Sequence, residues 1–314
     1  MSDTNVLAVA KLTPLLSSQL GAYKLHDRLH ETDPAAFAAI APHIRAITGG
    51  GESKIPASLI AQLPALEMIS IFGVGYDGVD VAAAKARGVP VTHTPNVLND
   101  DVADLAIALM LSAARQIPAA DRYVREGKWP TGPMPLARKM SGSRLGLVGM
   151  GRIGQAIAKR AEAFGMSVAY TSRSPKAGIG YRYVSNVKDL ASECDFLTVI
   201  TPGGAATRRL INAEVLAALG KNGILVNVAR GSVVDEAALI DALEQGVIAG
   251  AGLDVFENEP NVPERLKALS HVVLVPHVGS ATTQTRQAMA DLAANNLHAH
   301  FAGKPLLSPV PECQ

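Results

Sequence analysis

The 314-residue sequence is poor in cysteine and in net charge, and it has no long apolar run. Its two cysteines, Cys194 and Cys313, fit no metal-binding or disulfide pattern, and they suit a reducing compartment. The formal net charge is only +1, so neither a nucleic acid nor an anionic membrane is indicated as a partner. No apolar run approaches the roughly 20 residues that span a bilayer, and the polar N-terminus lacks a signal-peptide core. We therefore expect a cytoplasmic protein with no nucleic-acid partner, no membrane partner and no metal site.

What the sequence does contain is typical of a globular α/β protein. A hydrophobic content of 48% is ample for a sizeable core, and a length of roughly 150 residues per domain suggests two domains. Short apolar runs alternate with helical patterns, which predicts parallel sheets. The expected strands are 6–9, 46–48, 68–72, 89–91, 144–148, 167–170, 195–200, 224–228, 251–254 and 272–275. The expected helices are 35–44, 58–61, 81–87, 101–115 (capped by Asn99 or Asp100), 118–126, 155–164, 213–218, 236–244 and 283–300, the last closing the second domain.

The stretch 144–154 has the pattern of a dinucleotide-binding turn. A short apolar strand leads into G-x-G-x-x-G, formed by Gly149, Gly151 and Gly154, and a helical pattern follows. The first glycine permits the turn, the second lets the backbone approach a pyrophosphate, and the third lets the helix pack close to the strand. Phosphates would bind at the N-terminus of that helix. The alternative is an ordinary strand-to-helix turn without a ligand.

The loop after the next strand predicts which dinucleotide is bound. About 20 residues past the fingerprint, NAD sites place an acidic residue for the ribose 2′-OH, and NADP sites place an arginine for the 2′-phosphate. Here the loop contains Ser172, Arg173, Ser174 and Lys176, and no acid. Hydroxyls and two cations can hold a phosphate dianion, so we expect NADPH, with NADH as a weaker alternative. A solvated basic loop that tolerates either cofactor is the competing interpretation.

A second glycine-rich turn follows the strand at 68–72. Its sequence is Phe-Gly-Val-Gly-Tyr-Asp-Gly at 72–78. Ligands of open parallel sheets bind beyond the carboxyl ends of the strands, and the backbone N–H groups of Val74 and Gly75 could hold a small anion there. A plain turn is an equally good interpretation of this segment alone.

Three polar residues lie just beyond successive strands of the second half. They are Arg230, Glu259 and His277. The carboxyl ends of parallel strands share one edge of a sheet, so the three side chains could converge beside the dinucleotide. Taken singly, each has an ordinary structural explanation: a solvated arginine, a surface glutamate before a proline, or a hydrogen-bonded structural histidine. Their common position favours a catalytic group.

Together these motifs resemble the D-isomer-specific 2-hydroxyacid dehydrogenases, and among them most closely the glyoxylate/hydroxypyruvate reductases. The resemblance spans essentially the whole chain. It rests on the ordered segments 72–77, 94–97, 149–154, 227–231, 253–260 and 276–280, and for the narrower placement on 182–183, 289–292 and 296–301.

The resemblance implies two parallel-sheet domains, Rossmann-like and flavodoxin-like, with the active site in the cleft between them. The substrate domain would comprise residues 1–98 plus 285–314, and the nucleotide domain residues 99–284. Members are typically homodimers, with the nucleotide domains and the loop around Trp129 at the interface.

The resemblance also implies the chemistry. His277 would be the general acid, kept charged by Glu259, and Arg230 would bind the substrate carboxylate and carbonyl oxygen. Substrate contacts would come from Val74, Gly75, Arg230, His277 and Ser280. Cofactor contacts would come from Gly149, Gly151, Arg152, Ile153, Ser172, Arg173, Ser174, Lys176, Thr201, Pro202, Thr207, Val228, Ala229, Asp254, His277 and Gly279.

Other activities stay open on this sequence. One is another dehydrogenase of the family, such as a 2-ketogluconate reductase or a phosphoglycerate dehydrogenase, although the segment 49–54 supplies only one basic residue for a phosphorylated substrate. Another is a dinucleotide-sensing corepressor, since fold does not settle function. The sequence does not show which substrate is preferred among glyoxylate, hydroxypyruvate, pyruvate and longer 2-oxo acids.

Overall fold

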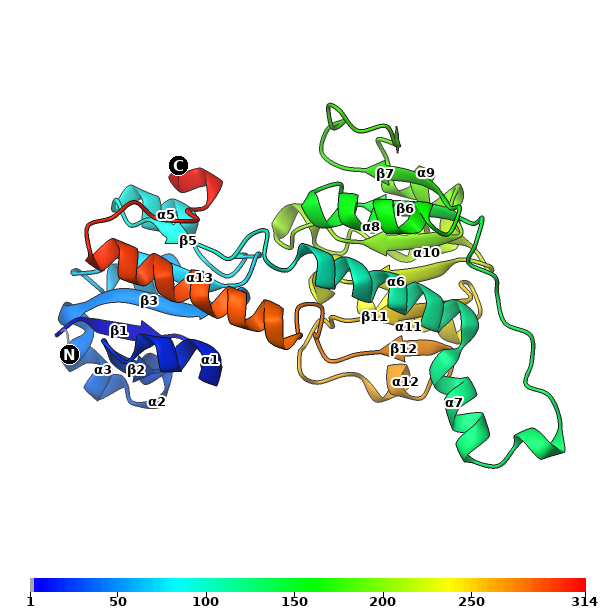
Figure 1. Cartoon of the computed structure of the whole chain (residues 1–314), viewed down its shortest axis with the longest axis horizontal. Coiled ribbons are helices and arrows are strands. Elements are labelled where there is room, and N and C mark those ends of the chain that lie inside the picture. The colour runs from blue at the N-terminus through cyan, green and yellow to red at the C-terminus, as the bar shows by residue number, and fades with distance from the viewer. Residues whose placement is uncertain (1–2) are drawn as a thin grey trace. The chain divides into compact units, whose positions relative to one another are not determined.

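The structure, a computed structural model, describes residues 3–314 and divides into two compact units (Figure 1). Unit 1 contains the residues up to Leu98 together with Thr282–Gln314, and unit 2 contains Asn99–Ala281. Each unit is built around one fully parallel sheet. The expected α/β class with two parallel sheets is thereby confirmed.

Unit 1 has a five-stranded sheet in the order β2-β1-β3-β4-β5. Its central strands are mostly buried because helices cover both faces. The strands are β1 (Asn5–Ala8), β2 (Lys24–Asp27), β3 (Ile44–Gly50), β4 (Met68–Phe72) and β5 (Val91–Thr92). The helices are α1 (Pro14–Ser17), α2 (Leu29–Thr32), α3 (Pro34–Ile40), α4 (Ala57–Ala61), α5 (Val81–Ala86) and α13 (Thr283–Phe301).

Unit 2 has a seven-stranded sheet in the order β12-β11-β10-β9-β6-β7-β8. The chain order reverses on either side of β6, and such a switch point is where open α/β sheets bind ligands. The strands are β6 (Arg144–Val148), β7 (Ser167–Thr171), β8 (Arg182–Tyr183), β9 (Phe196–Val199), β10 (Ile224–Asn227), β11 (Gly250–Leu253) and β12 (Val272–Leu274). The helices are α6 (Asn99–Arg115), α7 (Ile117–Arg125), α8 (Arg152–Glu162), α9 (Val187–Ser192), α10 (Ala213–Leu219), α11 (Glu236–Glu244) and α12 (Glu264–Lys267).

Two expectations about helices are wrong. Helix α6 begins at Asn99, so Asn99 and Asp100 lie in its first turn and do not cap a helix from 101. Asp100 suits that place, because a carboxylate is favourable at a helix N-terminus, and it also pairs with Arg160 of α8 at 2.9 Å. Helix α13 does not close the second unit. It packs on β4 of unit 1, where the Ser70 hydroxyl donates to the Ala293 carbonyl at 3.0 Å.

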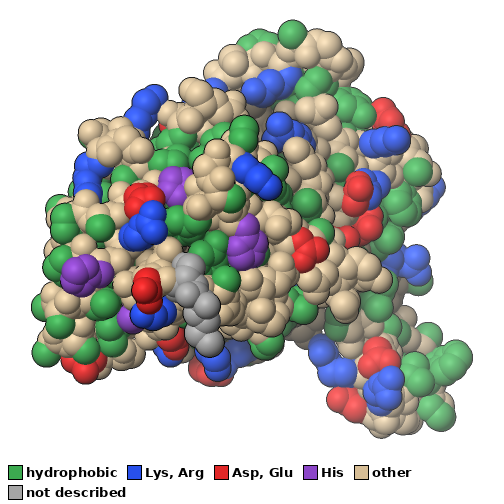
Figure 2. Space-filling model, turned by 60° about the vertical axis from the view of Figure 1, so that its left-hand side comes forward, with side chains coloured by type: hydrophobic (Ala, Val, Ile, Leu, Met, Phe, Trp, Pro, Cys, Tyr) green, Lys and Arg blue, Asp and Glu red, His purple; other side chains and the backbone are tan. Residues whose placement is uncertain are grey.

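The segment between α6 and β6 forms an arm that extends away from the rest of unit 2 (Figure 1). We call residues 117–143 the arm; it contains α7 and a short 3₁₀ turn at Trp129–Thr131. Four of its large apolar side chains are at least half exposed: Ile117, Val124, Trp129 and Leu136. Figure 2 shows hydrophobic side chains gathered at the outer end of the projection at lower right, beside charged ones.

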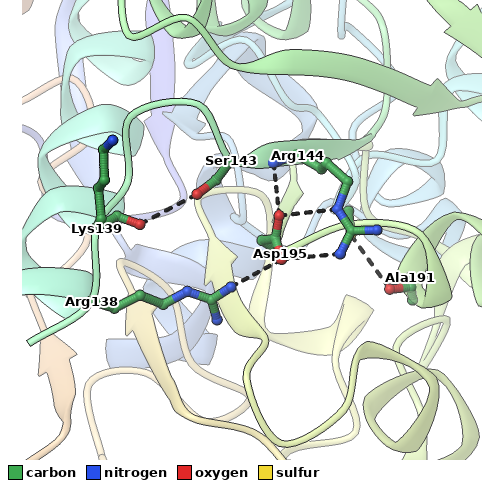
Figure 3. Close-up of polar contacts among 7 residues, drawn as sticks. Arg138, Lys139, Ser143, Arg144, Ala191 and Asp195 are labelled. Atoms are coloured by element: carbon green, nitrogen blue, oxygen red, sulfur yellow. Dashed lines mark hydrogen bonds and ion pairs between the residues drawn. The ribbon is translucent and has the colours of Figure 1, made fainter.

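Asp195 links Arg138 near the end of the arm to Arg144, the first residue of β6 (Figure 3). Asp195, just before β9, accepts from Arg138 at 2.9 Å and from the backbone N–H and guanidinium of Arg144 at 2.9 to 3.1 Å. These contacts lower the pKa of Asp195, the Arg144 hydrogen bond outweighing the effect of burial. A cavity of ≈ 620 Å³ lies beside the cluster, at the amino-terminal edge of the sheet. It is therefore remote from the carboxyl ends of the strands, where the expected site residues lie.

Across the described residues 3–314, no single helix is long and apolar enough to cross a membrane. The bent pair α6 and α7 passes that test only when taken together.

Candidate active site

The fingerprint turn joins β6 to α8 and is shaped as the glycines require. Gly149 has φ +113°, a left-handed conformation that side chains rarely adopt. A Cβ at Gly154 would lie 2.4 Å from the Gly149 carbonyl oxygen, so only glycine lets α8 pack this close. Around Gly151 there is open space, and Arg152 and Ile153 begin α8 beside it. The turn therefore leaves a helix N-terminus accessible to a phosphate group.

The loop after β7 presents its cations to the surface. The Ser172 hydroxyl donates to the Ser174 carbonyl at 2.7 Å, and the Lys176 backbone N–H donates to the Tyr170 hydroxyl at 2.8 Å. Arg173 and Lys176 are exposed, and within the described part of the chain neither forms an ion pair with an acidic residue. The loop is thus a folded turn whose two positive charges remain available to an anion.

The loop after β9 carries three further expected cofactor contacts. The Thr207 hydroxyl donates to the Pro202 carbonyl at 2.7 Å and to the Gly204 carbonyl at 3.3 Å, which closes the loop on itself. Thr201 and Thr207 are half-buried and Pro202 is exposed. The loop follows the carboxyl end of β9, the neighbour of β6 in the sheet, so it lies at the same switch point as the glycine turn.

Arg230 lies on a turn that Asn227 organises at the end of β10. The Asn227 amide donates to the Arg230 carbonyl at 3.0 Å and accepts from the Ala229 N–H at 3.0 Å. Val228 and Ala229 are buried beneath it. A Cβ at Gly231 would lie 1.9 Å from the Phe256 carbonyl carbon, so the turn lies directly against the loop after β11. Sequence patterns did not predict this role for Asn227; the one available signal was an amide side chain as the last residue of a buried strand.

His277 and Glu259 form a hydrogen-bonded pair. His277 Nδ1 lies 2.8 Å from Glu259 Oε2, and the other carboxylate oxygen accepts from the Phe256 N–H at 2.9 Å. Burial by itself would raise the pKa of Glu259, but the hydrogen bonds from His277 and Phe256 and the charges of His277 and Arg230 together lower it. An ionised Glu259 only accepts, so Nδ1 carries the proton and the ring is fixed in orientation.

Asp254 shapes the turn that carries His277. The His277 backbone has φ +52°, a left-handed conformation that is uncommon outside glycine. The Asp254 carboxylate accepts from the Val278 N–H at 2.6 Å and the Gly279 N–H at 2.9 Å, and its carbonyl accepts from the His277 N–H at 2.9 Å. Burial raises the pKa of Asp254, although these N–H groups and His277 oppose the shift. Asp254 therefore positions the turn that carries His277, a contribution that the motif alone did not indicate. The half-buried Ser280 follows in the same turn.

In unit 1, Val74 and Gly75 lie in the turn after β4. The turn packs tightly on the loop after β3: a Cβ at Gly78 would lie 2.3 Å from the Ser53 carbonyl oxygen. Among residues 3–314 neither the Val74 N–H nor the Gly75 N–H donates a hydrogen bond. Two successive N–H groups without a partner suit an anion.

Comparison with known proteins places this site in a family. Residues 107–279 match the family model described as D-isomer specific 2-hydroxyacid dehydrogenase, NAD binding domain. The hydroxyphenylpyruvate reductase of Plectranthus scutellarioides is 48% identical over 312 residues, which cover 99% of this chain and all of that protein. The chain belongs to the D-isomer-specific 2-hydroxyacid dehydrogenases. The resemblance carried by the motifs is thereby confirmed.

Two further members of this dehydrogenase family are similar along most of their length. A glyoxylate/hydroxypyruvate reductase A of Arabidopsis thaliana is 51% identical over 267 residues, 85% of each chain. The crystal structure of the NADPH-dependent glyoxylate/hydroxypyruvate reductase of Sinorhizobium meliloti, in complex with NADP and malonate, superposes with a TM-score of 0.93 at 47% identity. That alignment covers 99% of this chain and 98% of the other.

Proposed function

We propose that this dehydrogenase reduces small 2-oxo acids, with glyoxylate and hydroxypyruvate as the first candidates, to D-2-hydroxy acids at the expense of NADPH. The observation that carries the proposal is the hydrogen-bonded His277–Glu259 pair, held at the carboxyl edge of a dinucleotide-binding sheet. Support also comes from the reductases of Arabidopsis and Sinorhizobium, which act on these two substrates by name.

The residues of unit 2 fit a nicotinamide dinucleotide. The open turn at Gly151 and the N-terminus of α8 would hold the pyrophosphate, and the cofactor would supply the hydride that C2 of the substrate receives. Ser172, Arg173 and Lys176 would bind a 2′-phosphate, because the exposed loop offers two cations and no carboxylate. Preference for NADPH over NADH follows from this charge balance.

Substrate recognition would rest on donors to the carboxylate and to the carbonyl oxygen. The N–H groups of Val74 and Gly75 would bind the carboxylate, and the guanidinium of Arg230 would bind both carboxylate and carbonyl oxygen. A positive charge next to the C2 oxygen stabilises the negative charge that develops there during reduction.

His277 would then deliver the proton to the C2 oxygen. Glu259 orients the ring through Nδ1, which leaves Nε2 as the nitrogen that gives up its proton. The same pair in the reverse direction would accept a proton from a D-2-hydroxy acid.

We further propose that the protein works as a homodimer whose arm packs on a second copy. The arm exposes four large apolar side chains, those of Ile117, Val124, Trp129 and Leu136. Exposed apolar patches of this kind mark interfaces between proteins. Two free thiols, Cys194 and Cys313, support the expectation of a reducing compartment such as the cytoplasm.

A cofactor-oxidation assay tests the activity. NADPH absorbance is followed with glyoxylate, hydroxypyruvate, 4-hydroxyphenylpyruvate and 2-ketogluconate in turn. The aromatic substrate is included because the Plectranthus relative is named for it. Turnover that depends on a 2-oxo acid supports the reductase, and the ratio of kcat/KM values ranks the substrates. Tight NADPH binding without turnover on any of them would favour a dinucleotide-sensing protein instead.

A further inference from the structure

His93, which lies outside every motif used above, contacts the turn that carries Val74 and Gly75. Its Nδ1 lies 2.9 Å from the Val74 carbonyl oxygen. A carbonyl only accepts, so Nδ1 must carry the proton in this contact. The next residue repeats the arrangement with its backbone, because the Thr94 N–H donates to the Gly73 carbonyl at 2.8 Å.

These two contacts decide where the neighbouring N–H groups point. In a planar trans peptide the C=O and the following N–H point in opposite directions, and the only cis peptide bond of the described chain is Glu259–Pro260. Fixing the Gly73 carbonyl toward residue 94 therefore turns the Val74 N–H away from it. Fixing the Val74 carbonyl toward His93 turns the Gly75 N–H away likewise. Both donors are thus presented on the same side.

The His93 backbone is hydrogen-bonded to the C-terminal segment. Its backbone N–H donates to the Ser308 carbonyl at 3.1 Å, and the Ser308 hydroxyl donates to the His93 carbonyl at 2.6 Å. Ser308 in turn accepts from the fully buried Asn296 of α13 at 2.8 Å. His93 therefore forms hydrogen bonds with the C-terminal segment through its backbone and with the Gly73–Gly75 turn through its side chain.

Tyr76 restrains the imidazole from the turn itself. The two rings meet edge to face, with centroids 5.3 Å apart and planes at 88°. The Tyr76 hydroxyl donates to the Glu312 carboxylate at 3.1 and 3.3 Å. The tyrosine ring is therefore anchored at its hydroxyl by this hydrogen bond and at Cβ by the turn. Burial, together with Glu312, raises the pKa of Tyr76 to about 12, which keeps the phenol a donor at ordinary pH.

We infer that His93 is a positioning residue for substrate: by holding the Val74 carbonyl it aims the Gly75 N–H at the carboxylate of the 2-oxo acid. This rests on the proposed role of the Val74–Gly75 turn. It goes beyond that role, because it assigns the turn's geometry to a side chain that lies outside the turn.

Three variants test the inference. His93→Leu removes the donor and keeps an apolar side chain of similar bulk, and it should raise the KM for glyoxylate about tenfold, the order expected for one lost hydrogen bond. The kcat and the KM for NADPH should stay within about twofold of the wild type, since proton and hydride transfer use other groups. His93→Asn places an amide N–H near the position of Nδ1 and should restore most of the affinity. His43→Leu, at an exposed histidine elsewhere in unit 1, is the matched control.

Oxalate binding separates this inference from the proposed activity. Oxalate is a planar dianion that resembles the carboxylate and adjacent oxygen of a 2-oxo acid, and its Kd is measured by calorimetry on enzyme saturated with NADPH. A Kd about tenfold weaker in His93→Leu, recovered in His93→Asn, supports the role of His93 even if no substrate turns over. An unchanged Kd in His93→Leu, failure of the wild type to bind oxalate, or an equal fall in kcat and NADPH affinity would overturn it.

Discussion

At the scale of the residue, Arg230 and Glu259 have proposed roles that single substitutions can test. Arg230 differs from a simple positive charge because its guanidinium can donate two parallel hydrogen bonds to a carboxylate. Arg230→Lys keeps the positive charge but loses the pair of parallel N–H donors. The kcat/KM for glyoxylate should therefore fall about 10- to 100-fold, as expected for the loss of a hydrogen bond to a charged group. The Kd for NADPH should be nearly unchanged. A lysine variant with near-normal kcat/KM would show that bidentate recognition is not the role of Arg230.

The Glu259 carboxylate should set the pH range of the reaction. The charge of His277 helps to lower the pKa of Glu259, and by linkage a charged Glu259 favours the protonated imidazole. Glu259→Gln removes that charge, so the imidazolium should lose its proton at lower pH. The pH at which the rate of reduction declines on the alkaline side should therefore move downward. This is measured as the pH profile of kcat/KM, and a profile identical to that of the wild type would remove Glu259 from this role.

At this scale, sequence patterns predicted the candidate reacting groups but not the residues that position them. Arg230, Glu259 and His277 stand out because each is a charged or titratable residue just beyond an apolar strand. Asn227, Asp254 and His93 act through hydrogen bonds to backbone groups, and such bonds depend on how the turns fold in three dimensions. A sequence carries no local pattern for an Asp254 carboxylate that accepts from two N–H groups more than 20 residues away.

At the scale of the element, the buried strands and the longer helices were predictable, whereas the edge strands β2 and β8 were not. Strands such as β4 and β10 are predominantly apolar, since every residue in them is buried. By contrast β2, Lys-Leu-His-Asp at the edge of its sheet, has no fully buried residue, and β8 has only two residues. Their pairing with β1 and β7 depends on the neighbouring strand more than on their own sequence.

The loop after β7 is the element that should select the cofactor. Arg173→Ala removes a cation that would bind the 2′-phosphate, and kcat/KM with NADPH should fall about 10- to 100-fold, while that with NADH changes little. Ser172→Asp combined with Arg173→Ala introduces a carboxylate, which repels a phosphate and accepts from a ribose hydroxyl, so the preference should reverse to NADH.

Steady-state kinetics with both cofactors at matched ionic strength measures the preference. Exposed Arg115, at the end of α6, offers a matched control as Arg115→Ala, which should leave the cofactor ratio unchanged. A wild-type enzyme that prefers NADH would contradict this interpretation of the loop.

At the scale of the whole molecule, sequence patterns placed α13 with the wrong sheet, because a helical repeat does not reveal the surface on which it packs. The family resemblance assigned this helix to the first domain, and the contact of Ser70 with Ala293 agrees with that assignment. The exposed side chains of the arm were not predictable either, since exposure follows from the path of the chain and not from its composition.

The arm should hold two copies together. Leu136 is fully exposed in the single chain, and burying a leucine at an interface contributes about 1.5–3 kcal/mol. Leu136→Asp should therefore weaken the dimer by 100-fold or more, because a charge would also have to be desolvated. Leu307→Asp, at an exposed leucine outside the arm, is the control. Analytical ultracentrifugation over a concentration series gives the Kd, and a wild-type protein that is monomeric at micromolar concentration would contradict the proposed dimer.

The most direct test of the account is the oxidation of NADPH on addition of glyoxylate, compared between the wild type and His277→Ala. A general acid contributes roughly 10²–10⁴ to the rate, so kcat in the variant should be lower by that factor. The Kd for NADPH, measured by its fluorescence, should differ little, because the glycine turn and the loop after β7 are untouched. A wild type that oxidises NADPH with glyoxylate and a variant that turns over at the same rate would contradict the assignment of His277, and a wild type inactive with every 2-oxo acid would contradict the function itself.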